Sequence, residues 1–293
     1  MEIDIDFIRF LFALFCGYFL TLSGSLSQLV TNNTIASPST LGMDGAAVLF
    51  VILAQFFSIG VDLNISYVHT AFILFLIPFG IISFISLGLS KKTNNIWEHF
   101  DIQKIILFGL AFNLFVGAVF SIIQFLFMAL NFEFPTGLWF GSLKQYDKDY
   151  LMIFVVIFII TKVYILGVSQ KFEALNLGSS FALGLGIDVQ QIQRIALLLS
   201  FLLTGVVICY FGVFSFLGLI FPHILRNFGF FKSSMRRELL IGPYITGFIF
   251  GIVDQFCYQF DIYGAELPVG MVSSVVGAIF LIFLVLKTKI SRA

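Results

Sequence analysis

Long apolar runs, separated by short polar stretches, fill almost the whole chain. A helix that crosses a bilayer needs about 20 consecutive apolar residues, and most of the runs have about that length. The pattern therefore predicts an all-α polytopic membrane protein, with a single transmembrane domain over residues 1–293 and no soluble domain between its spans. The runs cover residues 7–30, 43–60, 67–89, 104–130, 149–168, 195–225, 239–260 and 269–287.

The amino-acid composition agrees with this class. The chain is 59% hydrophobic and 11% charged, with a mean hydropathy of +1.05, whereas a soluble domain carries about 25% charged residues. Its formal net charge is zero, so no nucleic acid is expected as a partner. The three cysteines and three histidines lack the spacing of metal ligands, and the chain has no P-loop motif. We therefore expect no cofactor and no metal site. The acidic start of the chain predicts no cleavable signal peptide.

The distribution of lysine and arginine predicts the orientation. Cytoplasmic segments of membrane proteins carry an excess of these residues, and here they gather in four groups. Only Arg9, Lys144 and Lys148 fall outside these groups, near segments that are rich in acidic residues. With the four groups inside, the N-terminus lies outside and the C-terminus is cytoplasmic. The groups are Lys91, Lys92 and Lys104; Lys162, Lys171 and Arg194; Arg226, Lys232, Arg236 and Arg237; and Lys287, Lys289 and Arg292.

The run 195–225 is too long for one span and short for two. Because Arg194 and Arg226 are both predicted inside, the chain between them must cross an even number of times. Two crossings share about 31 residues, or about 23 Å each. We place the turn near residues 210–215, eased by Gly205 and Gly212, and expect the second helix to be short, broken by Pro222 and covered by protein. The total becomes nine spans.

Charged side chains are scarce inside the predicted spans. Asp254 is the one acid well inside a span, and we interpret it as a hydrogen-bonding group in helix packing or capping. An ion-coupled carrier needs several buried ionisable groups, so this scarcity indicates that the energy for transport comes from elsewhere. Lys162 lies near the inner end of its span and can snorkel to water.

Two polar segments have distinct patterns. Residues 171–193 form a semi-polar, glycine-containing cytoplasmic stretch that predicts two short helices, separated at residues 177–180. Its apolar positions fit an interfacial helix on lipid or a docking element for a soluble partner equally well. In the first span, Gly17, Ser23, Gly24 and Ser27 recur at helical spacing and predict close helix packing.

Four blocks, in order, resemble the FecCD-type permeases of bacterial ABC importers for iron chelates, haem and cobalamin. They are FIRFLFALFCGYFLTLSGSLSQ followed by NNTIASPSTLGMDGAA; EALNLGSSFALGLGI; FSFLGLIFPHILRNFG; and VDQF with AELPVGMVSSVVGAIFLIFLVLK. The resemblance spans nearly the whole chain. It implies a type II importer permease, a fold that usually has ten spans. We therefore expect either that the chain has lost the family's first span or that its true start lies upstream of Met1.

The resemblance implies a transmembrane permease subunit that moves an iron complex, a siderophore or haem, across the bacterial cytoplasmic (inner) membrane. Import of cobalamin or another metal chelate by the same mechanism is the alternative, as is a stand-alone secondary carrier; a non-transporting paralogue is a third hypothesis. The implied partners are ABC ATPase subunits, which hydrolyse the ATP, an extracytoplasmic substrate-binding protein, and a second permease copy in a homodimer or heterodimer within the lipid bilayer.

The resemblance also implies roles for particular residues. Residues 171–193 correspond to the segment that couples the permease to the ATPase, and Arg9 and Glu266 fall in the blocks that dock the binding protein. Gly218, Pro222, His223 and Arg226 form the signature core, with His223 structural. The coupling residues are Glu173, Leu175, Leu177, Gly178, Ser179, Leu185 and Gly186.

The chain departs from the family pattern at several of these positions. Asp6 replaces the first arginine of the N-terminal block, and Tyr258 or Gln259 stands where an outer arginine is common. Those arginines pair with acidic residues of the binding protein, so Arg9 alone is left for this role. Thr34 replaces a proline of the N-terminal block, and Ser179 replaces a glutamate of the coupling segment.

Overall fold

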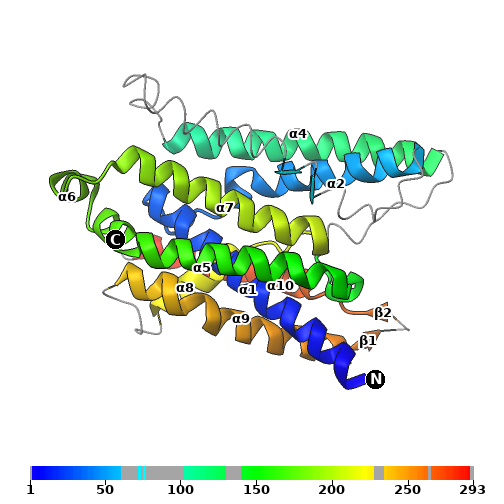
Figure 1. The fold of residues 1–293 in the computed structure, drawn as a ribbon. Helices are drawn as coiled ribbons and strands as arrows, with labels where there is room; N and C mark the ends of the chain where they lie inside the picture. The colour runs from blue at the N-terminus through cyan, green and yellow to red at the C-terminus, as the bar shows by residue number, and fades with distance from the viewer. Residues whose placement is uncertain are drawn as a thin grey trace.

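A computed structural model describes residues 2–60, 72–73, 75–76, 102–129, 140–227, 234–262 and 265–290. The predicted span 67–89 lies almost entirely outside these residues. The described part is an all-α bundle, which confirms the predicted fold class. Its helices are α1 (Glu2–Thr31), α2 (Met43–Gly60), α4 (Ile102–Ala129), α5 (Lys148–Asn176), α6 (Ser179–Gly184), α7 (Val189–Phe211), α8 (Leu217–Asn227), α9 (Met235–Gln259) and α10 (Val269–Ile290) (Figure 1).

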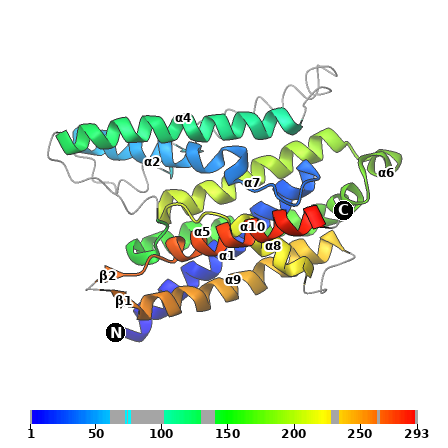
Figure 2. The same ribbon diagram turned by 180° about the vertical axis from the view of Figure 1, so that it is seen from behind.

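Short elements complete the described chain. Two 3-10 turns, η1 (Ser39–Leu41) and η3 (Leu143–Gln145), precede α2 and α5. A two-stranded antiparallel hairpin of β1 (Asp261–Ile262) and β2 (Ala265–Glu266) joins α9 to α10. The N-terminus and this hairpin lie at one end of the bundle, and α6 and the C-terminus lie at the other (Figures 1 and 2). We call these the Arg9 end and the Arg226 end.

Four described helices are long and apolar enough to cross a membrane. They are α1 over Asp6–Thr31, α5, α7 and α9, and shorter apolar helical stretches lie at Met43–Ala54, Asn113–Ala129 and Val269–Phe283. The outward faces of α5, α9 and α10 carry large exposed apolar side chains such as Ile160, Phe256 and Ile279. Such faces are expected where lipid or another membrane helix replaces water.

Helix α1 forms the centre of the bundle and packs on α9, α7, α8 and α5. Its small residues permit this, as the sequence predicts. A Cβ added at Gly17 would lie 2.8 Å from Gly247 Cα of α9, and one at Gly24 would lie 1.7 Å from the carbonyl oxygen of Gly218 in α8. Close backbone approach of this kind is how membrane helices gain packing contacts that lipid cannot supply.

Hydrogen bonds between hydroxyl groups complement this packing. Ser23 Oγ lies 2.7 Å from Ser200 Oγ and 2.7 Å from Thr204 Oγ1 of α7, and Ser27 Oγ also lies 2.7 Å from Ser200 Oγ. On the opposite side of α1, Thr21 Oγ1 lies 2.6 Å from Thr246 Oγ1 of α9. These buried hydroxyls therefore link α7 and α9 to α1, at sites where an unpaired group would be costly.

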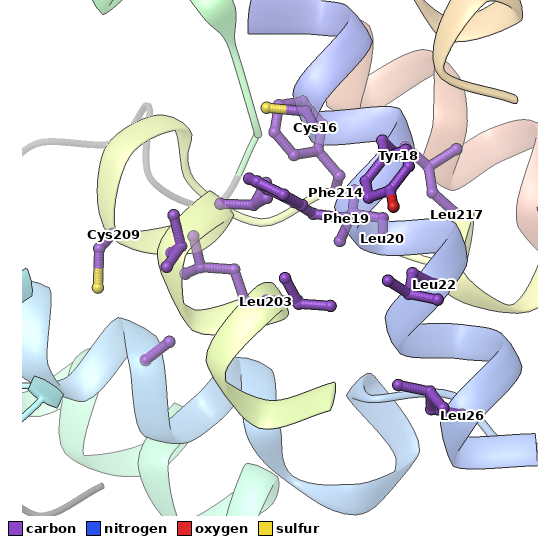
Figure 3. Close-up of a cluster of buried hydrophobic side chains, with 14 of the residues drawn as sticks. Cys16, Tyr18, Phe19, Leu20, Leu22, Leu26, Leu203, Cys209, Phe214 and Leu217 are labelled. Atoms are coloured by element: carbon purple, nitrogen blue, oxygen red, sulfur yellow. The ribbon is translucent and has the colours of Figure 1, made fainter. Parts of the chain in front are cut away.

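The apolar core fills the space around α1. Phe12 packs edge-on against Phe154 of α5 and Phe211 of α7, with ring centroids 5.3 and 5.2 Å apart. Figure 3 shows a neighbouring part, in which Phe19 and Leu22 of α1 and Leu203 of α7 are labelled. The three cysteines are buried and unbridged, and they pack as small apolar residues.

Candidate functional site

Helix α7 begins earlier than the hydropathy pattern predicts. It runs over 23 residues from Val189, or about 34 Å, and its N-cap is Asp188, whose Oδ1 accepts a 2.9 Å hydrogen bond from the Gln191 N–H. Helix α8 has only 11 residues, or about 16 Å. The prediction of two equal crossings of about 23 Å is therefore wrong, because the polar first turn of α7 belongs to the helix.

The turn between α7 and α8 lies where the sequence predicts it. Gly212 ends α7 with a φ of 81°, a conformation that glycine adopts without strain. The next residues are non-helical, and their backbone is paired: the Gly141 N–H donates to the Val213 carbonyl at 3.0 Å, and the Ser142 N–H to that of Phe211 at 2.9 Å. Protein therefore covers the freed backbone groups, as expected for a broken helix in a membrane.

Gly205 does not ease this turn, contrary to the prediction. It lies inside α7, and a Cβ there would come 2.1 Å from Cζ of Phe75. The absence of a side chain at Gly205 lets the ring of Phe75 pack directly against α7. This packing role cannot be predicted from the position of Gly205 near the turn.

The short helix α8 carries the predicted signature core. Gly218 faces α1, Pro222 is buried inside the helix, and both lie against protein. His223 is half-buried, with its ring edge-on to Phe280 of α10 at 5.3 Å. Within the described ranges, no group of three or more His, Cys, Asp or Glu residues could hold a metal ion.

At the Arg226 end, one ionic cluster joins three helices. Arg226 of α8 makes a bidentate contact with Glu238 of α9, with its Nε 2.8 Å from Oε2 and its Nη2 2.7 Å from Oε1. Its Nη1 donates to Oε1 of Gln28 of α1 at 2.8 Å, and Ser25 Oγ donates to Glu238 at 2.8 Å. Glu238 is only 3% exposed. Both carboxylate oxygens of Glu238 accept hydrogen bonds, which offset the cost of burying the ion pair.

A polar cavity of about 380 Å³ opens beside this cluster. It lies between the C-terminal ends of α1, α5 and α8 and the first turn of α9. Nε2 of Gln28 is buried without a hydrogen-bond partner among the described residues. The cavity lining includes Gln28, Asn32, Asn176, Arg226, Ser234 and Glu238.

The predicted coupling segment, residues 171–193, forms the far tip of the Arg226 end (Figure 1). It contains the last turn of the long α5 and the short α6, so its first helix is a continuation of the span rather than a separate element. The predicted break is confirmed: Leu177 ends α5, and Gly178 has a φ of 125°. Gly186 turns the chain again with a φ of 74° before α7.

The predicted coupling residues fall into two groups. Leu177 and Leu185 are 63% and 60% exposed, and Phe181 and Leu183 between them are also exposed. Gly186 is exposed and Gly178 and Ser179 are half-exposed, whereas Leu175 is buried in the core. The segment therefore presents an apolar surface at the tip of the bundle.

Glu173 contacts its own chain. Its Oε2 accepts a 3.2 Å hydrogen bond from Ser234 Oγ and another from the Arg236 N–H, both at the start of α9. The sequence does not reveal this contact, because the two partners lie about 60 positions further along the chain.

At the Arg9 end, the predicted docking residues lie together. Arg9 Nε and Nη2 contact the two carboxylate oxygens of Asp254 at 2.8 and 3.2 Å, and Nη1 contacts Oε2 of Glu266 at 3.0 Å. The guanidinium also lies 4.4 Å from the ring centroid of Tyr258. Arg9 is 4% exposed and Asp254 is fully buried, so the guanidinium is held by its own chain and its docking role stays a prediction.

The pairing of Arg9 with Asp254 was missed from the sequence. A usable signal existed: each is a lone intramembrane charge near the same end of its span, and such charges are expected to pair. Lys162 also has partners within the bundle: its Nζ donates to the Leu240 carbonyl at 3.1 Å and lies 4.5 Å from the centroid of the Tyr244 ring.

The fold and its apolar helices define an all-helical membrane protein. The family model of the FecCD transport family matches residues 1–287. The hemin permease HmuU of Yersinia pestis is 29% identical over 99% of this chain and 84% of its own length, and the iron(3+)-hydroxamate permease FhuG of Bacillus subtilis is 27% identical over 96% and 82%. A solved metal-chelate type ABC transporter in an inward-facing conformation matches with a TM-score of 0.76 at 22% identity, over 96% of this chain and 87% of its own.

The chain therefore belongs to the FecCD transport family of ABC importer permeases. Membership implies a bacterial inner-membrane subunit that is not itself catalytic and that works with ATPase and substrate-binding partners. This favours the importer over the stand-alone carrier.

Proposed function

We propose that this chain is the membrane subunit through which an ABC importer carries an iron complex, a siderophore or haem, into the cell. The observation that supports this most directly is the family match over residues 1–287. The names of the relatives support the substrate class: they include permeases for hemin, iron(3+)-hydroxamate, petrobactin and Fe(3+) dicitrate. A vitamin B12 permease of Vibrio vulnificus is 26% identical, so cobalamin is the second candidate.

The proposed ATPase contact is the exposed apolar surface of α6 and its flanks. Leu177, Phe181, Leu183 and Leu185 are each at least half exposed, which is a costly arrangement in water unless a partner covers it. With the Arg226 end in the cytoplasm, as the distribution of basic residues predicts, these side chains reach a soluble ATPase. Movement of α6 on ATP binding then switches the permease between its outward- and inward-open states.

We further propose that two permease subunits form the pathway between them. The exposed apolar faces of the bundle offer surfaces for a second copy or a paralogue. The opposite ends occupied by the two termini fit an N-terminus outside and a C-terminus inside. Arg9 and Glu266 lie at the outer end in this orientation, where a substrate-binding protein would dock.

The test is reconstitution. The chain is co-expressed with an ABC ATPase and a substrate-binding protein encoded by neighbouring genes, where such genes are present. The complex is purified, placed in proteoliposomes and supplied with haemin, a ferric hydroxamate, ferric citrate or cobalamin. The proposal predicts co-purification with the ATPase and ATP-dependent uptake of one of the iron complexes. Uptake that continues without ATP would contradict the assignment as an ABC importer. Uptake of cobalamin alone would show that the substrate is cobalamin and not an iron complex.

A further inference from the structure

Glu173 occupies the joint between the coupling segment and the bundle. Its backbone carbonyl accepts a 3.3 Å hydrogen bond from the Leu177 N–H, which closes the last turn of α5. Its side chain points to the first turn of α9 and accepts from Ser234 Oγ and from the Arg236 N–H. Glu173 therefore contacts the end of α5 through its backbone carbonyl and the start of α9 through its carboxylate.

The contact to α9 is of a strong kind. The first backbone N–H groups of a helix have no partner inside the helix, and a carboxylate there is also attracted by the helix dipole. Ser234 is the N-cap and accepts from the Arg237 N–H at 3.3 Å while its hydroxyl donates to Glu173. The carboxylate and the hydroxyl thus satisfy two of the free N–H groups together.

One turn further along α9, Glu238 leads to the core of the bundle. It holds Arg226 of α8 in the bidentate contact and accepts from Ser25 of α1. Arg226 in turn contacts Gln28 of α1. A continuous series of polar contacts therefore runs from the coupling segment, through the first turn of α9, to α8 and α1.

We propose that Glu173 is a positioning residue, which ties the coupling segment to α9 so that a displacement of α6 reaches α8 and α1 through the Glu238–Arg226 pair. The proposal rests on the proposed function, because it assumes an ATPase that moves α6. It assigns the carboxylate of Glu173 to a contact inside the permease, while the exposed apolar residues of α6 contact the ATPase. Loss of this tie lets α6 move without α9.

The experiment compares variants of the whole complex of permease, ATPase and binding protein in proteoliposomes. It measures ATP hydrolysis, ATP-driven uptake of haemin or a ferric hydroxamate, and the melting temperature. Glu173→Ala removes the carboxylate oxygen that accepts both hydrogen bonds. Its loss is expected to lower uptake per ATP by about tenfold with ATP hydrolysis kept, and to lower the melting temperature by only about 2–4 °C, as for a lost helix cap. Glu173→Gln retains an acceptor oxygen and stays within about twofold. The exposed Lys148 lies at the other end of α5, outside the coupling segment, and Lys148→Ala is the control.

Two further results decide the mechanism. If the path runs through the start of α9, adding Ser234→Ala to Glu173→Ala lowers uptake per ATP no further, whereas multiplied effects of the two substitutions would overturn the path. Unchanged uptake per ATP in Glu173→Ala, or a fall in ATP hydrolysis in proportion to the fall in uptake, would overturn the positioning role. Failure of the proposed function is distinguishable, because the parent complex itself would then show no ATP-dependent uptake.

Discussion

Gly24 is the position at which the packing of α1 is most sensitive to a single methyl group. A Cβ at this position would lie 1.7 Å from the Gly218 carbonyl oxygen and 2.5 Å from its carbonyl carbon, whereas ordinary contact begins near 3.4 Å. The obstacle is backbone, which cannot rotate away as a side chain would. For Gly24→Ala, α1 and α8 must therefore separate by the difference, about 1.7 Å, at this point.

This separation has consequences on two sides of α1. It opens a gap beside the buried Gly218, and it displaces Ser23 from its 2.7 Å contacts with Ser200 and Thr204. Forced overpacking costs about 1–3 kcal/mol, and stretched buried hydroxyl contacts add about 1 kcal/mol. We expect Gly24→Ala to destabilise the protein by about 3 kcal/mol, which lowers the melting temperature by about 6 °C or more.

The measurement is thermal unfolding of the detergent-purified protein, and Gly167→Ala is the matched control. Gly167 lies in α5, and a Cβ there meets no atom within 4 Å. Alanine at such a helical site is favoured over glycine by about 0.5–1 kcal/mol, so this variant melts at or above the parent temperature. The reasoning is refuted if Gly24→Ala melts as high as Gly167→Ala.

Three further predictions concern the ionic clusters and the coupling segment. Arg226→Ala leaves the buried Glu238 carboxylate uncompensated and is expected to cost about 3–5 kcal/mol in thermal unfolding, while Glu238→Gln in the same chain recovers part of it; an equal loss in the single and double variants would count against the pair. At the other end, Arg9→Ala destabilises through the fully buried Asp254, and Asp254→Asn partly restores the melting temperature because an amide needs no counter-charge; no restoration would argue for a purely steric effect of Arg9. Leu185→Glu places a charge on a 60% exposed side chain, so the protein keeps its melting temperature but loses co-purification with the ATPase; retained ATP-driven uptake would show that this surface rests on lipid.

Local patterns in the sequence were sufficient for the all-α class and for several turns. The apolar runs predict spans because burial in lipid adds up residue by residue along a helix. The break at Leu177–Gly178 and the turn at Gly212 are also local, since each depends on a glycine at a positive φ. The coupling segment and signature core were found through the resemblance of their sequence blocks to one family.

The helix starts were less predictable. Hydropathy places the beginning of the α7 span at residue 195, but the helix starts at Val189 because Asp188 caps it. The first residues of α7 include several polar side chains, whose backbone is helical although they add little apolar surface. A count of apolar residues therefore misses this first turn and allots only about 23 Å to each of the two crossings in the run 195–225.

The sequence by itself determined which segments are apolar helices and where glycine permits the chain to turn, because those properties depend on neighbouring residues. Only the tertiary structure decided what each polar side chain contacts. Arg9 meets Asp254 across 245 positions of the chain, and Glu173 reaches the start of α9 across about 60. Such partners depend on how the helices pack in three dimensions, and the charge of Glu173 looks the same in the sequence whether it faces an ATPase or caps a helix of its own chain.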